Sequence, residues 1–173
     1  MEVSVPVTVS VDSLALVPFR QYDRVPTYYI LGGLVFQPLT GNYLDTWGKL
    51  EKAPPALTSY FYQGKRNQDR SQIVVLTSIL GGEITVGYEE AQYHVVSRVN
   101  GVPISSMADL VRAVESNPGT YHTVTDERGH QIVLEQIKIA EQSEVLLKRY
   151  KIRSDRSEDL KEGEGVKARS VGR

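Results

Sequence analysis

The sequence predicts an α+β fold in which the strands are mostly antiparallel. Residues 95–114 read as a strand, a tight turn and an amphipathic helix, and residues 121–136 alternate in the manner of two strands joined by a turn. A further helical pattern follows at 139–150. We therefore expect antiparallel strands together with helices, with an extended arm before this unit and a helix after it.

The chain begins with a predicted extended arm. Valines occupy every second position from Val3 to Val11, which is the period of a half-buried strand. Pro6 has no N–H to donate to a ladder, so an edge strand or a lone arm is favoured over a central strand. We assign residues 1–25 to a strand and linker from a preceding domain, a pattern typical of a segment cut from a longer protein.

Aromatic and β-branched residues lie on both sides of a Gly-Gly pair in residues 26–39. Gly32 and Gly33 allow a sharp turn whose consecutive N–H groups can form a concave site for a carboxylate or a peptide carbonyl. A strand beginning at Leu34 would then present a free edge to which an extended peptide can add. The alternative for a Gly-Gly pair taken alone is a plain strand with a glycine bulge.

Residues 42–70 are rich in Gly, Pro, Lys, Gln and Tyr and predict an insertion with at most a short helix. It could carry recognition, or it could be a solvated loop that packs four aromatic residues on the core: Trp47, Tyr60, Phe61 and Tyr62. The continuous apolar run within residues 71–80 predicts a buried strand, which Gly81 and Gly82 end.

The unit at 95–114 has a signal for each of its parts. Its strand is β-branched, and Asn100 and Gly101 supply left-handed turn residues. Ser105 or Ser106 can cap the helix that follows. The apolar residues of that helix share one face at spacings of three and four: Met107, Leu110, Val111 and Val114.

The last part of the chain predicts a hairpin, a helix and a tail. Strands at 121–125 and 130–136 flank a turn, and the helix at 139–150 has basic residues near its C-terminal end. Residues 153–173 carry almost nothing apolar and are expected to be disordered.

Composition limits the class of protein. With 173 residues, 40% of them hydrophobic, the chain can bury one ordinary core. A net charge of -1 argues against a nucleic-acid partner, and the absence of cysteine excludes disulfides, thiolate catalysis and cysteine-ligated zinc. No apolar run could span a membrane and no targeting signal is present, so periplasm, cell envelope and cytoplasm of a bacterium all remain open.

Three phrases together resemble the PDZ domains of Deg/HtrA serine proteases. They are Tyr-Tyr-Ile-Leu-Gly-Gly-Leu-Val-Phe at 28–36, Ile-Thr-Val-Gly-Tyr-Glu-Glu at 84–90, and Val-Asn-Gly at 99–101 followed by the helix. The first phrase is similar to the second, C-terminal PDZ domain of that family in particular. The resemblance implies a PDZ-like domain over residues 26–152, a partly open barrel or sandwich capped by two helices, with 42–70 as its insertion.

The resemblance also implies a peptide-binding groove between a sheet edge and a helix. The residues it assigns to peptide binding are Tyr29, Ile30, Leu31, Gly32, Gly33, Leu34, Val35, Phe36, Met107 and Val111. Animal signalling PDZ domains usually have Gly-Leu-Gly-Phe in the loop and a histidine at the helix start, whereas Gly32-Gly33 and Ser106 stand here. An internal peptide segment is therefore as suitable a ligand as a free C-terminus.

No catalytic residues are expected on this chain. Deg/HtrA proteases hold their nucleophile in a Gly-Asn-Ser-Gly-Gly loop, and no serine here is followed by Gly-Gly. The three histidines, His94, His122 and His130, are interpreted as surface or hydrogen-bonded residues, because neither a triad nor a metal-ligand spacing is evident. We expect no metal and no cofactor.

Two functional hypotheses follow, and both place the chain in a parent serine endopeptidase of the protein quality-control type. In the first, the domain is a regulatory module that binds C-terminal or internal polypeptide segments by β-strand addition. In the second, it is an assembly module that contacts neighbouring protease or PDZ domains, with its groove filled by its own chain.

Overall fold

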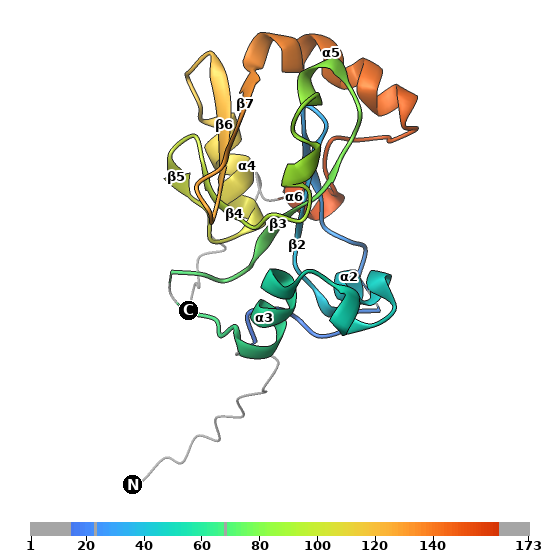
Figure 1. The fold of residues 1–173 in the computed structure, drawn as a ribbon. Helices are drawn as coiled ribbons and strands as arrows, with labels where there is room; N and C mark the ends of the chain where they lie inside the picture. The colour runs from blue at the N-terminus through green and yellow to red at the C-terminus, as the bar shows by residue number, and fades with distance from the viewer. Residues whose placement is uncertain (1–14, 23, 68, 163–173) are drawn as a thin grey trace, which may run out of the picture.

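The computed structural model describes residues 15–22, 24–67 and 69–162, which form two antiparallel sheets flanked by helices (Figure 1). The three-stranded sheet has the order β1-β2-β3 and the four-stranded sheet the order β5-β4-β6-β7. The predicted α+β fold, a partly open sandwich of antiparallel strands, is confirmed. The Val3–Val11 pattern lies outside the described residues.

The first sheet is built around a hairpin. It comprises β1 (Tyr29–Leu31), β2 (Leu34–Pro38) and β3 (Val74–Ile79). Gly32 and Gly33 have φ angles of 54° and 100°, the left-handed region that glycine enters without strain, and this reverses the chain between β1 and β2. An isolated bridge between Val75 and Val95 connects this sheet to the start of β4.

The second sheet comprises β4 (Val96–Val99), β5 (Val102–Pro103), β6 (Tyr121–Asp126) and β7 (Gln131–Glu135). Asn100 and Gly101 have φ angles of 51° and 79°, as expected for a tight turn of the primed type. The predicted hairpin at 121–136 is present as β6 and β7, and Gln136 begins the next helix instead of ending the strand.

Helix α4 (Met107–Glu115) starts where its cap predicts. The Ser106 hydroxyl accepts a hydrogen bond from the Asp109 amide at 3.1 Å, and the apolar face of the helix is buried. Helix α5 (Gln136–Arg149) starts before the predicted residue 139, and α6 (Glu158–Glu162) was not predicted. No helix among the described residues is long and apolar enough to cross a membrane.

Two apolar clusters form the interior. The larger one lies between the sheets and α4, and contains among others Leu34, Phe36, Val99, Leu110 and Leu134. The smaller one lies under the insertion and contains among others Leu16, Leu39, Leu44, Leu57 and Ile73. Leu16 and Val17 are almost fully buried, so the last part of the segment predicted as a linker packs on the domain.

The insertion is more helical than the sequence predicted. It contains α2 (Gly41–Leu44), the 3₁₀ turns η1 (Asp45–Trp47) and η2 (Leu50–Lys52), and α3 (Pro55–Gln63), with α2 and α3 together at the lower end of the view in Figure 1. Pro55 stands at the first position of α3, where its missing N–H costs nothing. The 3₁₀ turns η3 (Glu83–Thr85) and η4 (Glu89–Ala91) lie between β3 and β4.

The prediction of disorder from residue 153 onward is wrong for residues 153–162. Residues 155–157 pair with β1, Ser157 is buried, and Leu160 of α6 packs against the larger cluster. Polar composition misled the prediction, because this segment is held mainly by main-chain hydrogen bonds and ion pairs, which leave no hydrophobic signature. Residues 163–173 lie outside the described part of the chain.

Candidate peptide-binding groove

Six of the ten residues predicted to line the groove lie together in the core. Tyr29, Leu31, Leu34, Phe36, Met107 and Val111 are all members of the larger apolar cluster. Helix α4 lies next to β2, as the resemblance implied. However, each of these side chains is at most 8% exposed, so they face the core instead of an open slot.

The free edge predicted at Leu34 does not exist in this structure. β2 pairs with β3 on one side and with β1 on the other, where Tyr29 lies opposite Phe36 and Leu31 opposite Leu34. The Gly32-Gly33 turn causes this, because it folds the three residues before it back onto β2. The main-chain groups that would receive a peptide at β2 are therefore used within the chain.

The Gly-Gly loop is also covered. A Cβ atom at Gly32 would lie 2.9 Å from side-chain atoms of Ile139 and Ile84, and one at Gly33 would lie 3.0 Å from the carbonyl oxygen of Leu80. Residues of η3 and α5 thus lie directly against the loop. An incoming carboxylate would have to displace them to reach its amides.

The outer edge of β1 is occupied in turn by residues 155–157. The Ile30 amide donates to the Asp155 carbonyl at 2.7 Å, and the Ser157 amide donates to the Tyr28 carbonyl at 3.0 Å. Tyr29 and Arg156 lie opposite each other in an antiparallel bridge. We call residues 155–157 the closing segment, because it pairs with β1 as an added strand would.

Arg156 fixes the closing segment to α4 and β1. Its guanidinium lies 2.5 Å from Glu115 Oε1, 3.1 Å from Asp155 Oδ2 and 5.0 Å from the centre of the Tyr29 ring. Partial burial works to lower the pKa of Arg156, but hydrogen bonds to Glu115 and Asp155 outweigh it and raise the pKa. Burial raises the pKa of Tyr29 to about 12, so its ring stays neutral beneath the cation.

The other recognition candidates have structural partners. His122 is buried and its Nδ1 lies 3.1 Å from the Asn100 side-chain amide, and burial lowers its pKa. Of the aromatic residues in the insertion, Trp47, Tyr60 and Phe61 pack on the smaller cluster, whereas Tyr62 is 68% exposed. The insertion therefore serves mainly to cover its own core.

The comparison with known families now decides the class of this domain. A family model described as PDZ domain matches residues 17–159. The chain belongs to the PDZ domain family. The match extends beyond residues 26–152 at both ends. It therefore includes the buried Val17 and the closing segment.

The relatives of this PDZ domain are Deg-type proteases. Putative protease Do-like 3, mitochondrial, from Arabidopsis thaliana is 35% identical over 146 residues, which is 84% of this chain and 24% of that protein. Protease Do-like 2, chloroplastic, from the same organism is 32% identical over 85% of this chain and 24% of that protein. The predicted resemblance to the PDZ domain of a Deg/HtrA protease is confirmed, and the PDZ domain spans about a quarter of the length of these two relatives.

Sequence reasoning missed two groups of residues. The closing segment carries no motif, and only its pairing with β1 reveals it. His94, Asp126 and His130 lie far apart in the chain or across a turn, yet their side chains meet in space. Both groups depend on contacts between elements, which local spacing does not encode.

Proposed function

We propose that this PDZ domain is a regulatory and assembly module of a Deg-type serine protease, with its strand-addition edge filled by its own chain. One observation carries the proposal: β2 is paired on both edges, by β3 and by β1. PDZ domains that bind peptide by strand addition need an unpaired strand edge. With that edge filled, the domain would act through contacts with neighbouring protease or PDZ domains.

The closing segment supports this proposal. It pairs with the edge of β1, the next place where a strand could add to this side of the sheet. The ion pair of Arg156 with Glu115 then connects it to α4, the helix that would form the opposite wall of a groove. Both sides of the presumed peptide path are thus held together by residues of the same chain.

Peptide binding is the second candidate, and a specific feature favours it. The closing segment contacts β1 through main-chain hydrogen bonds and polar side chains, and Glu115 is 39% exposed. An added strand makes main-chain hydrogen bonds of the same kind, so an extended polypeptide could compete for the same edge. In this case Tyr29, Ile30 and Leu31 would contact the peptide, and Gly32, Gly33, Leu34, Val35, Phe36, Met107 and Val111 would support the site from behind.

A peptide titration separates the two candidates. Peptides with hydrophobic C-termini and internal segments of the same composition are titrated calorimetrically into the wild-type chain and into the double variant Arg156→Ala, Ser157→Pro. The proline removes the amide that donates to Tyr28, and the alanine removes the contact with Glu115. Arg153→Ala is the matched control, because Arg153 is exposed and takes no part in the bridge.

Each outcome decides between the candidates. The self-filled module predicts no binding for any of the three proteins, because β1 still covers β2. Displacement predicts binding that appears or strengthens at least tenfold in the double variant alone. Tight binding to the wild type and the control would contradict the self-filled module directly.

The activity of the parent protein is part of the same proposal. We propose that the parent is a serine endopeptidase of protein quality control and that the nucleophile lies on another domain, because no serine of this chain precedes Gly-Gly. Incubating this chain with unfolded casein tests the last point. Cleavage that survives repurification of the chain would place a catalytic site here and contradict it.

A further inference from the structure

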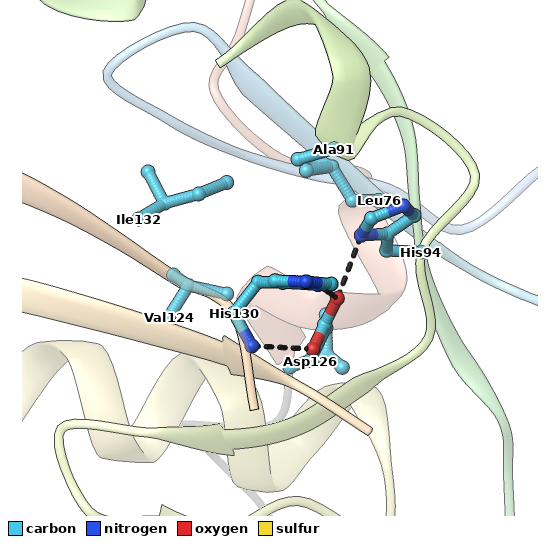
Figure 2. A pocket seen from close by; sticks show the side chains of 8 residues that line it. Leu76, Ala91, His94, Val124, Asp126, His130 and Ile132 are labelled. Carbon is cyan, nitrogen blue, oxygen red and sulfur yellow. Dashed lines mark hydrogen bonds and ion pairs between the residues drawn. The ribbon is translucent and has the colours of Figure 1, made fainter. Parts of the chain in front are cut away.

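We propose that His94, Asp126 and His130 form a binding site for a divalent transition-metal ion of the zinc class. One ligand atom from each of these residues lies within 4.8 Å of the others. His94 precedes β4, Asp126 ends β6, and His130 precedes β7, so three segments converge there (Figure 2). This inference does not depend on the proposed function.

The carboxylate of Asp126 is oriented as a metal ligand requires. Its Oδ1 accepts hydrogen bonds from the backbone amides of Arg128 and His130, both at 2.8 Å. Its Oδ2 therefore faces the two imidazoles, 2.7 Å from His94 Nδ1 and 2.9 Å from His130 Nδ1. Such hydrogen bonds from the main chain fix the orientation of a ligating carboxylate and favour metal binding.

The His94 nitrogen is the unexplained atom of the cluster. Among the described residues His94 Nδ1 is buried and meets no regular hydrogen-bond geometry, and its close polar contact is the ion-pair contact with Asp126 Oδ2 at 2.7 Å. A buried polar nitrogen without a well-formed hydrogen bond costs free energy. A bound cation would give this nitrogen a bond along its lone pair.

The surroundings also suit an ion. The cluster borders a small cavity of about 20 Å³, which holds about one water-sized particle, and the rest of the wall is apolar: Leu76, Ala91, Val96, Val124 and Ile132. An apolar shell around polar ligands lowers the local dielectric and strengthens coordination. Ligand atoms around tetrahedral zinc are about 3.3 Å apart. Asp126 Oδ2 lies 2.7 and 2.9 Å from the two imidazole nitrogens, so these contacts need only a small outward rotation of the side chains to admit an ion.

The ligand set selects the class of metal. Two imidazole nitrogens and one carboxylate oxygen suit Zn²⁺ and its neighbours in the first transition row, whereas Ca²⁺ and Mg²⁺ prefer sites built from oxygen alone. A bound ion would join the loop before β4 to the turn between β6 and β7. We therefore expect it to stabilise the domain.

Zinc chloride is titrated calorimetrically into the full chain, and His130→Gln is compared with Glu127→Gln. His130 is 64% exposed, so its replacement leaves the fold intact, and Glu127 is a carboxylate of the same turn outside the cluster. We expect one ion per wild-type chain with micromolar or tighter affinity, a loss of at least tenfold in His130→Gln, and no loss in Glu127→Gln. Saturating zinc should also raise the melting temperature of the wild type but not that of His130→Gln.

Cobalt(II) gives an independent readout, because a tetrahedral ion absorbs strongly in the visible range and a hydrated ion does not. Visible bands that saturate at one equivalent and disappear in His94→Gln would support the site. The absence of saturable zinc binding to the wild type would overturn the proposal. Equal affinity in His130→Gln and the wild type would overturn it as well.

Discussion

The backbone amide of Ile30 donates a hydrogen bond to the carbonyl of Asp155 at 2.7 Å, across more than a hundred residues of chain. This contact places the closing segment on the edge of β1. With the closing segment in place, β1 has a partner on both sides and its outer edge is no longer free to accept another strand. The second candidate function, peptide binding by displacement, depends on how firmly this contact and its neighbours hold.

Replacing Arg156 by alanine should destabilise the domain. The side chain is only 17% exposed and contacts Glu115, Asp155 and the ring of Tyr29, so its loss should cost about 2 kcal/mol of unfolding free energy. Urea unfolding followed by circular dichroism measures this difference. Arg153→Ala, at an exposed position close by, should change stability by no more than about 0.5 kcal/mol. Equal stability of the two variants would show that Arg156 does not anchor the segment.

Replacing Gly33 by alanine should cost more than replacing Gly87. Both glycines have positive φ angles, 100° and 89°, so both variants carry backbone strain of about 1 kcal/mol. Only at Gly33 would the new Cβ also approach the Leu80 carbonyl and the Thr85 side chain at 3.0 Å, whereas Gly87 faces open space. Thermal melts of the two variants give the comparison, and a melting temperature of Gly33→Ala equal to that of Gly87→Ala would contradict the close packing of the loop.

Asp109, in the first turn of α4, should make the free energy of unfolding depend on pH in the acid range. Burial works to raise the pKa of Asp109, but hydrogen bonds from Ser105 and Ser106 outweigh it, and the pKa is lowered from 3.8. The ionised carboxylate therefore contributes stability above the unfolded value of 3.8, and this contribution is lost as the pH falls through the lower folded value. Asp109→Asn should lose about 1 kcal/mol at neutral pH. Urea unfolding at several pH values should show the difference from wild type shrinking in acid, and a constant difference would contradict the prediction.

His122 should contribute a second pH dependence, nearer neutrality. Burial lowers its pKa from 6.5, so the unfolded chain takes up a proton below that value before the folded one does. The contribution of neutral His122 is complete above pH 6.5 and falls as the pH is lowered further. His122→Gln should flatten this part of the stability curve. The prediction fails if the curves of wild type and His122→Gln run parallel.

The sequence predicted those parts of the fold whose signals are local. The Ser106 cap, the apolar face of α4 and the Asn100-Gly101 turn each act over a few residues, and the structure confirms all three. The gathering of Phe36 and Met107 in one cluster also followed, through the family resemblance. The β2 edge did not follow, because Gly32 and Gly33 allow either an open loop or a reversal, and contacts with Ile84 and Ile139 accompany the reversal.

The most direct test of the account is whether the β1 edge is occupied in the free domain. Nuclear magnetic resonance of the unliganded chain should show a cross-strand nuclear Overhauser effect between the Ile30 amide proton and the Arg156 α proton, together with slow hydrogen exchange at Ile30. This result is predicted because the Ile30 amide is hydrogen-bonded to Asp155. Rapid exchange at Ile30 without the cross-strand contact would leave the β1 edge open and contradict the claim that residues 155–157 fill it.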